Sequence, residues 1–107
     1  MRDQRAGIRL PMKLPVVISW KTASGSYRRT QADTANVSGN GLLLLTPTRF
    51  RPQTPVRCRV SLPNAVAGVS MELICLGRVV RRSGGRETPA VAAVIDEYEL
   101  RRTPNET

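Results

Sequence analysis

Two arginines near the start of the chain, Arg5 and Arg9, are spaced four positions apart. Each guanidinium group is a planar fork that can hold a phosphate, or the Hoogsteen edge of a guanine, with two parallel hydrogen bonds. The pair therefore suits an anionic purine ligand, and it would equally suit a solvated basic arm. The same spacing recurs between Arg78 and Arg82 and between Arg82 and Arg86, so spacing alone does not choose between these interpretations.

A polar, glycine-bearing stretch from Asn36 to Gly41, with the pattern N-x-S-x-x-G, is the second candidate. Asn36 offers an amide and Ser38 a hydroxyl, and both groups can hydrogen-bond the edge of a base. Gly39 and Gly41 allow positive φ and a close approach of the backbone, which leaves room for a flat ring. In the alternative interpretation, the Asn and Ser side chains only satisfy the backbone of their own turn.

The composition of the chain limits the chemistry that it can perform. Its 17 Lys and Arg residues outweigh 8 Asp and Glu residues, and the formal charge of +9 is concentrated in the first thirty residues. Such an excess attracts anionic ligands. The sequence contains no His, which excludes Ser-His-Asp triads and imidazole metal sites, and its carboxylates show no paired spacing. We therefore expect a binding protein that is not an enzyme, with no metal and no cofactor. The two cysteines, Cys58 and Cys75, lie in apolar runs and are expected to be reduced core residues.

The pattern of apolar residues predicts short strands separated by turns. The 8 prolines argue against long helices. Apolar and β-branched runs predict six strands, at 16–20, 27–34, 42–46, 56–62, 71–80 and 91–95. This pattern is typical of an antiparallel barrel or sandwich. The segment 96–102 is expected to form two helical turns at most, with Glu97 and Glu99 balancing Arg101 and Arg102.

Taken together and in this order, the two motifs resemble those of the PilZ family. The members of that family are bacterial receptor domains for cyclic di-GMP. That family has R-x-x-x-R in an N-terminal segment and, further along, D/N-x-S-x-x-G in a turn between strands. The apolar run Leu42–Leu45 and the stretch Gly77–Arg81 also follow the family's order, so the resemblance covers most of the chain. It implies an all-β fold, a six-stranded antiparallel β-barrel with a flexible basic N-terminal arm and at most a short C-terminal helix.

The resemblance also implies a role for each motif residue. Arg5 and Arg9 would contact the phosphates and guanine edges of the dinucleotide, and could stack on guanine. Asn36 would hydrogen-bond a guanine edge, and Ser38 would donate to a phosphate or a base. Gly41 would keep the entry to the following strand clear of the ligand.

The function expected from the resemblance is to bind cyclic di-GMP and to relay it to an unidentified downstream protein by ordering the N-terminal arm. The arm would comprise residues 1–12 and carry the R-x-x-x-R motif, the barrel would comprise 13–102, and 103–107 would form a tail. The charged N-terminus lacks an apolar signal core, and no run is long enough to span a membrane. We therefore expect a cytoplasmic protein without membrane insertion.

Two other functions stay open at this point. A small basic barrel could bind single-stranded nucleic acid, but such proteins use aromatic stacking platforms. The chain has one Trp, two Tyr and one Phe, which argues against nucleic acid. A PilZ-like domain could also be a protein adaptor that no longer binds ligand. Asn36, where the family more often has Asp, keeps that alternative open.

Overall fold

The computed structural model describes residues 9–10, 13–62 and 70–103. The described residues form seven strands and no helix. The strands are β1 (Arg9–Leu10), β2 (Pro15–Lys21), β3 (Tyr27–Ser38), β4 (Gly41–Leu45), β5 (Pro55–Leu62), β6 (Met71–Ser83) and β7 (Ala90–Arg102). Strands β2 to β7 close into an antiparallel barrel. The prediction of an all-β, six-stranded antiparallel barrel is therefore confirmed.

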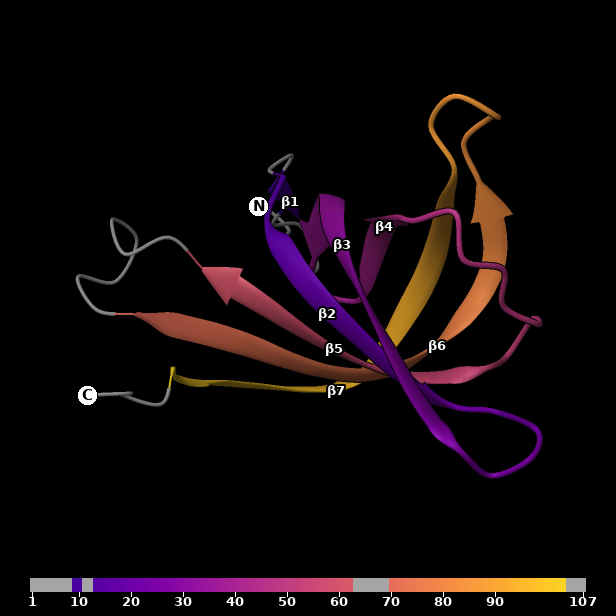
Figure 1. Ribbon diagram of the computed structural model, residues 1–107. Helices are drawn as coiled ribbons and strands as arrows, with labels where there is room; N and C mark the ends of the chain where they lie inside the picture. The colour runs from indigo at the N-terminus through magenta and orange to yellow at the C-terminus, as the bar shows by residue number, and fades with distance from the viewer. Residues whose placement is uncertain (1–8, 11–12, 63–69, 104–107) are drawn as a thin grey trace.

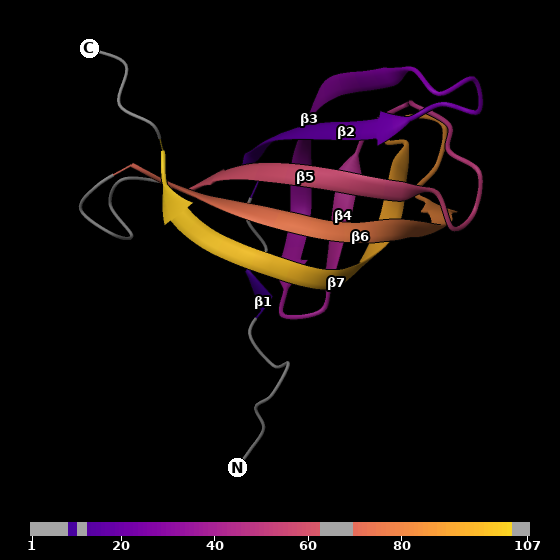
Figure 2. The same cartoon turned by 90° about the horizontal axis from the view of Figure 1, so that it is seen from below.

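The barrel closes because β3 pairs with a different strand along each half of its length. Its first half, from Tyr27 to Asp33, is antiparallel to β2, and its second half, from Asp33 to Ser38, is antiparallel to β4. The other neighbours follow in the order β2-β5-β6-β7-β4. Figures 1 and 2 show β2, β5, β6 and β7 side by side as a curved wall. Closure pairs strand edges that would otherwise be open to other chains.

Side chains alternate between the inside and the outside of the barrel, as expected for strands. Strand β5 shows this clearly, because Cys58 and Val60 are buried whereas Arg57 and Arg59 are exposed. The interior is thus apolar and the outer face carries the charge. The buried apolar core consists of Leu14, Val16, Ile18, Val37, Leu42, Leu44, Val56, Cys58, Val60, Cys75, Val79, Val91 and Ala93.

The two cysteines are free and buried in this core, as predicted. Cys58 and Cys75 lie directly opposite each other on β5 and β6. Burial, with Cys75 as a second cause, raises the pKa of the Cys58 thiol from 9.0 to about 12, and burial raises the pKa of the Cys75 thiol to about 11. Both thiols therefore stay protonated at neutral pH and behave as small apolar groups.

The segment 96–102, for which the sequence predicts two helical turns at most, is strand throughout. Strand β7 continues to Arg102 and pairs with β6, where Glu72 lies opposite Arg101. The Glu72 side chain is 6% exposed, and its carboxylate accepts hydrogen bonds from the Arg101 guanidinium at 3.3 Å. Arg101 thus pairs with Glu72 on the neighbouring strand, whereas the sequence predicts that Glu97 and Glu99 balance Arg101 and Arg102. A two-turn helix is marginal in water, whereas a ladder to β6 satisfies the backbone at once.

Gly77 lies where the backbones of β6 and β7 approach each other closely. The register of the two strands shifts between Leu76 and Gly77, where Asp96 is an extra residue on β7. A Cβ at position 77 would overlap the carbonyl oxygen of Val94. Only glycine therefore fits this bulge without a shift of the backbone.

We predict that Gly77→Ala destabilises the barrel by about 2–3 kcal/mol, because β6 and β7 must move apart to admit a methyl group. Gly85→Ala is the matched control, since a Cβ at position 85 meets nothing within 4 Å. Its free energy of unfolding should change by less than about 0.5 kcal/mol. Urea unfolding measures both values, and equal stability of the two variants would contradict the role given to Gly77.

Candidate functional site

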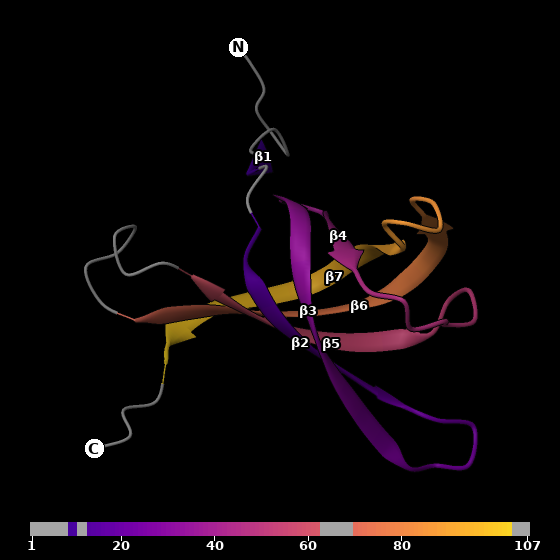
Figure 3. The ribbon, with the colours of Figure 1, turned by 45° about the horizontal axis from the view of Figure 1, so that its top comes forward.

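Strand β1 brings the second arginine of the N-terminal motif to the end of β3. Arg9 pairs with Ser38 in antiparallel register. Because β2 also pairs with β3, β1 and β2 lie in line along the same strand. Figure 3 shows β1 close to the end of β3 from which β4 starts. The two sequence motifs thus meet through the backbone at Arg9 and Ser38, whereas Arg5 lies outside the described residues.

A bulge in β3 turns the second motif outward. The register between β3 and β4 shifts between Thr34 and Asn36, so Ala35 is an extra residue in β3. Strict alternation would make Asn36 follow Thr34 into the core. The extra residue reverses the phase, and Thr34 is fully buried while Asn36 is exposed. The bulge therefore places Asn36 and Ser38 on the outer face of the barrel.

The motif forms the end of a β-hairpin, and its turn is shorter than the sequence predicts. Strand β3 continues to Ser38, which pairs with Gly41, so Gly39 and Asn40 alone form the turn. The Ser38 hydroxyl donates to the Gly41 carbonyl and to the Asn40 side-chain oxygen, both at 3.2 Å. The Ile95 N–H donates to the Asn40 carbonyl at 3.0 Å and ties the turn to β7. Because a hydroxyl has one hydrogen, Ser38 offers a ligand its lone pairs rather than a free donor.

Gly41 allows the backbones of β4 and β7 to pack closely, and its own backbone is not left-handed. Among the glycines in the described residues, positive φ occurs at Gly25 and Gly84, so the positive φ that Gly39 and Gly41 would allow does not occur. A Cβ at position 41 would lie 3.2 Å from the Ala93 carbonyl oxygen, closer than ordinary van der Waals contact. The close backbone approach that glycine permits is therefore the feature used here, between β4 and β7.

A row of register-matched residues crosses five strands beside this turn. The row consists of Arg9, Ser38, Gly41, Val94 and Arg78, on β1, β3, β4, β7 and β6. Adjacent strands lie about 4.8 Å apart, so the row spans about 19 Å. The middle of the row consists of Gly41 and Val94, which carry no charge, and Arg78 forms an ion pair with Asp96 at the far end. Sequence reasoning missed Arg78, because only the registers of β4, β7 and β6 place it in line with the motif.

This surface has the chemistry to hold a flat anionic ligand. Gly41 presents backbone without a side chain, and the exposed Asn36 amide makes no hydrogen bond within the described part of the chain. Over the same residues, no three His, Cys, Asp or Glu side chains gather in a way that could hold a metal ion. A search of the described ranges found no helix long and apolar enough to cross a membrane.

Comparison with known proteins gives a family for this barrel. The family model of the PilZ domain matches residues 2–102. The chain belongs to the PilZ domain family. Domains of this family bind ligands and partner proteins and are not enzymes. No curated protein matches the sequence.

Several solved structures resemble the barrel, including the following two. The Bacillus subtilis inhibitor of motility (MotI/DgrA) has a TM-score of 0.70 and 15% identity over 90% of this chain, which spans 44% of the length of that protein. The PilZ domain of CeSA from a cellulose-synthesizing bacterium has a TM-score of 0.53 and 27% identity, over 85% of this chain and 84% of that one. The first likeness shows the fold alone, and the second agrees with the family.

We predict that Ser38→Ala destabilises the barrel by about 1 kcal/mol, because the turn loses the hydroxyl that holds the Gly41 carbonyl and the Asn40 side chain. Ser61→Ala, at an exposed position of β5, is the control and should be close to neutral. Thermal or urea unfolding of both variants without ligand provides the comparison. If both serines tolerate alanine equally, the hydroxyl of Ser38 does not hold the turn.

Proposed function

We propose that this domain binds cyclic di-GMP at the row that contains Arg9, Ser38 and Gly41, and that it passes the signal to a partner protein. The pairing of Arg9 with Ser38 is the observation on which the proposal depends, because it joins the two sequence motifs. Membership of a family whose domains generally receive cyclic di-GMP supports the choice of ligand.

The site residues suit the groups that cyclic di-GMP presents. Arg5 and Arg9 would hold its phosphates or the Hoogsteen edges of its guanines with bidentate hydrogen bonds. The exposed Asn36 amide would bond a guanine edge, and the Ser38 lone pairs would accept from a guanine N–H. Each bidentate contact contributes about 1–3 kcal/mol. A few such contacts reach about −8 kcal/mol after ordering costs, which corresponds to micromolar affinity.

Arg78 is a further candidate contact at the far end of the row. Its guanidinium has five N–H donors, and the ion pair with Asp96 uses the Nη1 nitrogen. Other donors are therefore left for a phosphate. A ligand that lies across Gly41 and Val94 would then be held from both ends.

The signal would pass through the N-terminal segment. A ligand held by Arg5 and by the barrel at once would join this segment to the outer face, and a partner protein would bind the joined surface. The proposal places this exchange in the cytoplasm, with output by contact and without catalysis. The alternative is an adaptor that binds its partner without cyclic di-GMP, and ligand titration separates the two.

We predict that cyclic di-GMP binds with micromolar or better affinity in isothermal titration calorimetry, and that GTP, cyclic GMP and cyclic di-AMP bind at least about tenfold more weakly. Arg5→Ala and Arg9→Ala should each weaken cyclic di-GMP binding by at least about tenfold, because each removes a charged bidentate donor. Arg78→Ala should weaken it by a smaller factor.

The control is Arg86→Ala, which removes the same charge from an exposed position in the loop between β6 and β7. A general loss of positive charge would affect all four variants alike, whereas a specific site affects Arg86→Ala least. Absence of binding by folded wild-type protein at high ligand concentration would leave the adaptor as the function. Equal affinity in the Arg5, Arg9 and Arg86 variants would remove the motif from the site.

A further inference from the structure

A second surface lies on the outer face of β2, β3 and β5. Ser19 on β2 pairs with Arg29 on one side and with Arg57 on the other, and Val17 pairs with Gln31 and Arg59 in the same way. Short side chains on β2 are thus flanked by long ones on both neighbouring strands. We call this surface the basic trough. Hollows of about 520 Å³ and 370 Å³ adjoin it, and both include Arg29.

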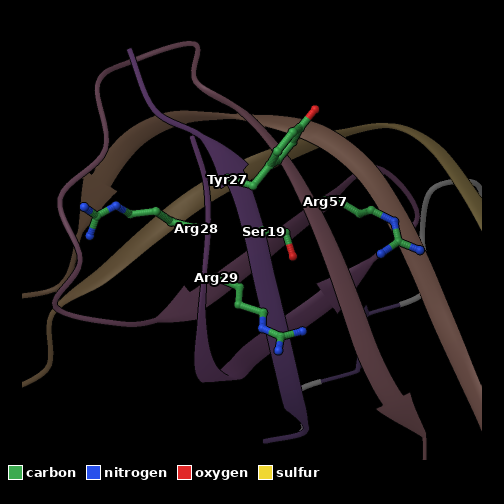
Figure 4. A pocket seen from close by; sticks show the side chains of 5 residues that line it. All are labelled: Ser19, Tyr27, Arg28, Arg29 and Arg57. Carbon is green, nitrogen blue, oxygen red and sulfur yellow. The ribbon is translucent and has the colours of Figure 1, made fainter. Parts of the chain in front are cut away.

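The close view of the trough shows how these side chains lie. In Figure 4 Ser19 lies between Arg29 and Arg57, Tyr27 stands at one end, and Arg28 is directed away to the other side of its strand. Arg29 and Arg57 lie two strand spacings apart, about 10 Å between Cα atoms. Their guanidinium groups can therefore hold an object that lies over β2 from both sides.

The trough is positively charged, and within the described residues its cations form no ion pairs. Lys21, Arg29, Arg57 and Arg59 are all exposed, and none of them forms an ion pair with a described residue. The acids on the rows of Arg57 and Arg59 are Glu97 and Glu99, which lie on β7, two strands beyond β5 and about 10 Å away between Cα atoms. Arginines without an ion pair, on both sides of a strand with short side chains, favour an anionic occupant.

We propose that the basic trough binds an extended acidic segment of a partner protein, with Asp or Glu at alternate positions. Alternate residues of an extended chain lie on one side and about 6.8 Å apart. Arg57 and Arg59 have the same spacing, because they too are alternate residues of a strand. A segment along β2 would thus match its carboxylates to Arg57 and Arg59, with Arg29 on the other side.

A peptide fits this surface better than a nucleic acid does. Single-stranded nucleic acids need aromatic side chains on which successive bases stack, and Tyr27 is the one aromatic residue that lines the two hollows. The Lys21 ammonium already lies over its ring, 5.8 Å from the centroid. The charge on the trough is therefore available, but the stacking platform is not.

The trough is separate from the candidate ligand site. Arg29 and Ser38 are nine residues apart on β3, which corresponds to about 30 Å along the strand. The inference deepens the partner-binding part of the proposed function and rests on it for its biological role. Binding of an acidic peptide to the trough does not itself require cyclic di-GMP, so the two can be tested apart.

The test is fluorescence anisotropy with a labelled peptide of alternating Glu and Ser, about twelve residues long, at low ionic strength. We expect this peptide to bind, and its affinity to fall as the salt concentration is raised. It should bind more tightly than a matched peptide of alternating Gln and Ser. The double variant Arg57→Gln/Arg59→Gln should bind it at least about tenfold more weakly, since two charged hydrogen-bonding groups are lost.

The matched control is Arg81→Gln/Arg82→Gln, which removes two exposed charges from β6, outside the trough. Its affinity for the Glu-Ser peptide should fall by less than about threefold. Arg29→Gln tests the other wall of the trough independently, should the double variant fail to fold. Titration of each variant with cyclic di-GMP, which should be unchanged, separates failure of the trough from failure of the proposed function.

Three outcomes would overturn the inference. The first is an equal loss of affinity for the Glu-Ser peptide in the trough and control variants. The second is that the Gln-Ser peptide binds as tightly as the Glu-Ser peptide. The third is tighter binding of an oligothymidylate than of the Glu-Ser peptide, with the same dependence on Arg57 and Arg59, which would make the surface a nucleic-acid site.

Discussion

A single strand, β3, closes the barrel and carries the second motif, and both depend on the extra residue at Ala35. The strand must change partner from β2 to β4 halfway along its length. A bulge increases the local twist and bend that such a change requires. It also reverses the alternation, so that Thr34 enters the core while Asn36 and Ser38 face outward. The buried Thr34 hydroxyl accepts from the Leu14 N–H at 3.0 Å, which satisfies its polar group in the interior.

The charged side chains lie on the outer face of the barrel, because side chains alternate between the two faces of each strand. Alternation sends arginines outward on β3 and β5 without any cost to an apolar core. The candidate ligand site and the basic trough then occupy opposite ends of the same outer face along β3. About 30 Å of this strand separates them, which leaves room for a ligand and a partner on the barrel at the same time. Any energetic coupling between them would be reciprocal.

The likeness to MotI/DgrA shows how loosely sequence constrains this barrel. A TM-score of 0.70 at 15% identity means that strand period and turn positions suffice to define the fold, because many apolar combinations fill a core of this volume. Ligand and partner choice depend on a few outward side chains instead. Motif residues and the trough are therefore more informative about function than the fold is.

Six strands, an apolar interior, reduced cysteines and two motifs all follow from the order of residues along the chain. Period-2 alternation is a local signal, and it is strong in segments such as Pro55–Leu62. Motif residues are likewise visible one by one, without knowledge of their neighbours in space. Hence the resemblance to the PilZ family follows from the types, spacing and order of residues along the chain, with Arg5 and Arg9 in the first motif and Asn36, Ser38 and Gly41 in the second.

Contacts between strands that are distant in the sequence determine the strand registers. The registers in turn determine the bulge at Ala35, the extension of β7 beyond Asp96, and the positions of Arg78 and the basic trough. Each of these depends on which residue lies opposite another on a strand far away in the sequence. A shift of one position would send every side chain of a strand to the other face. Local sequence patterns do not determine the register, because the register depends on how all six strands pack together.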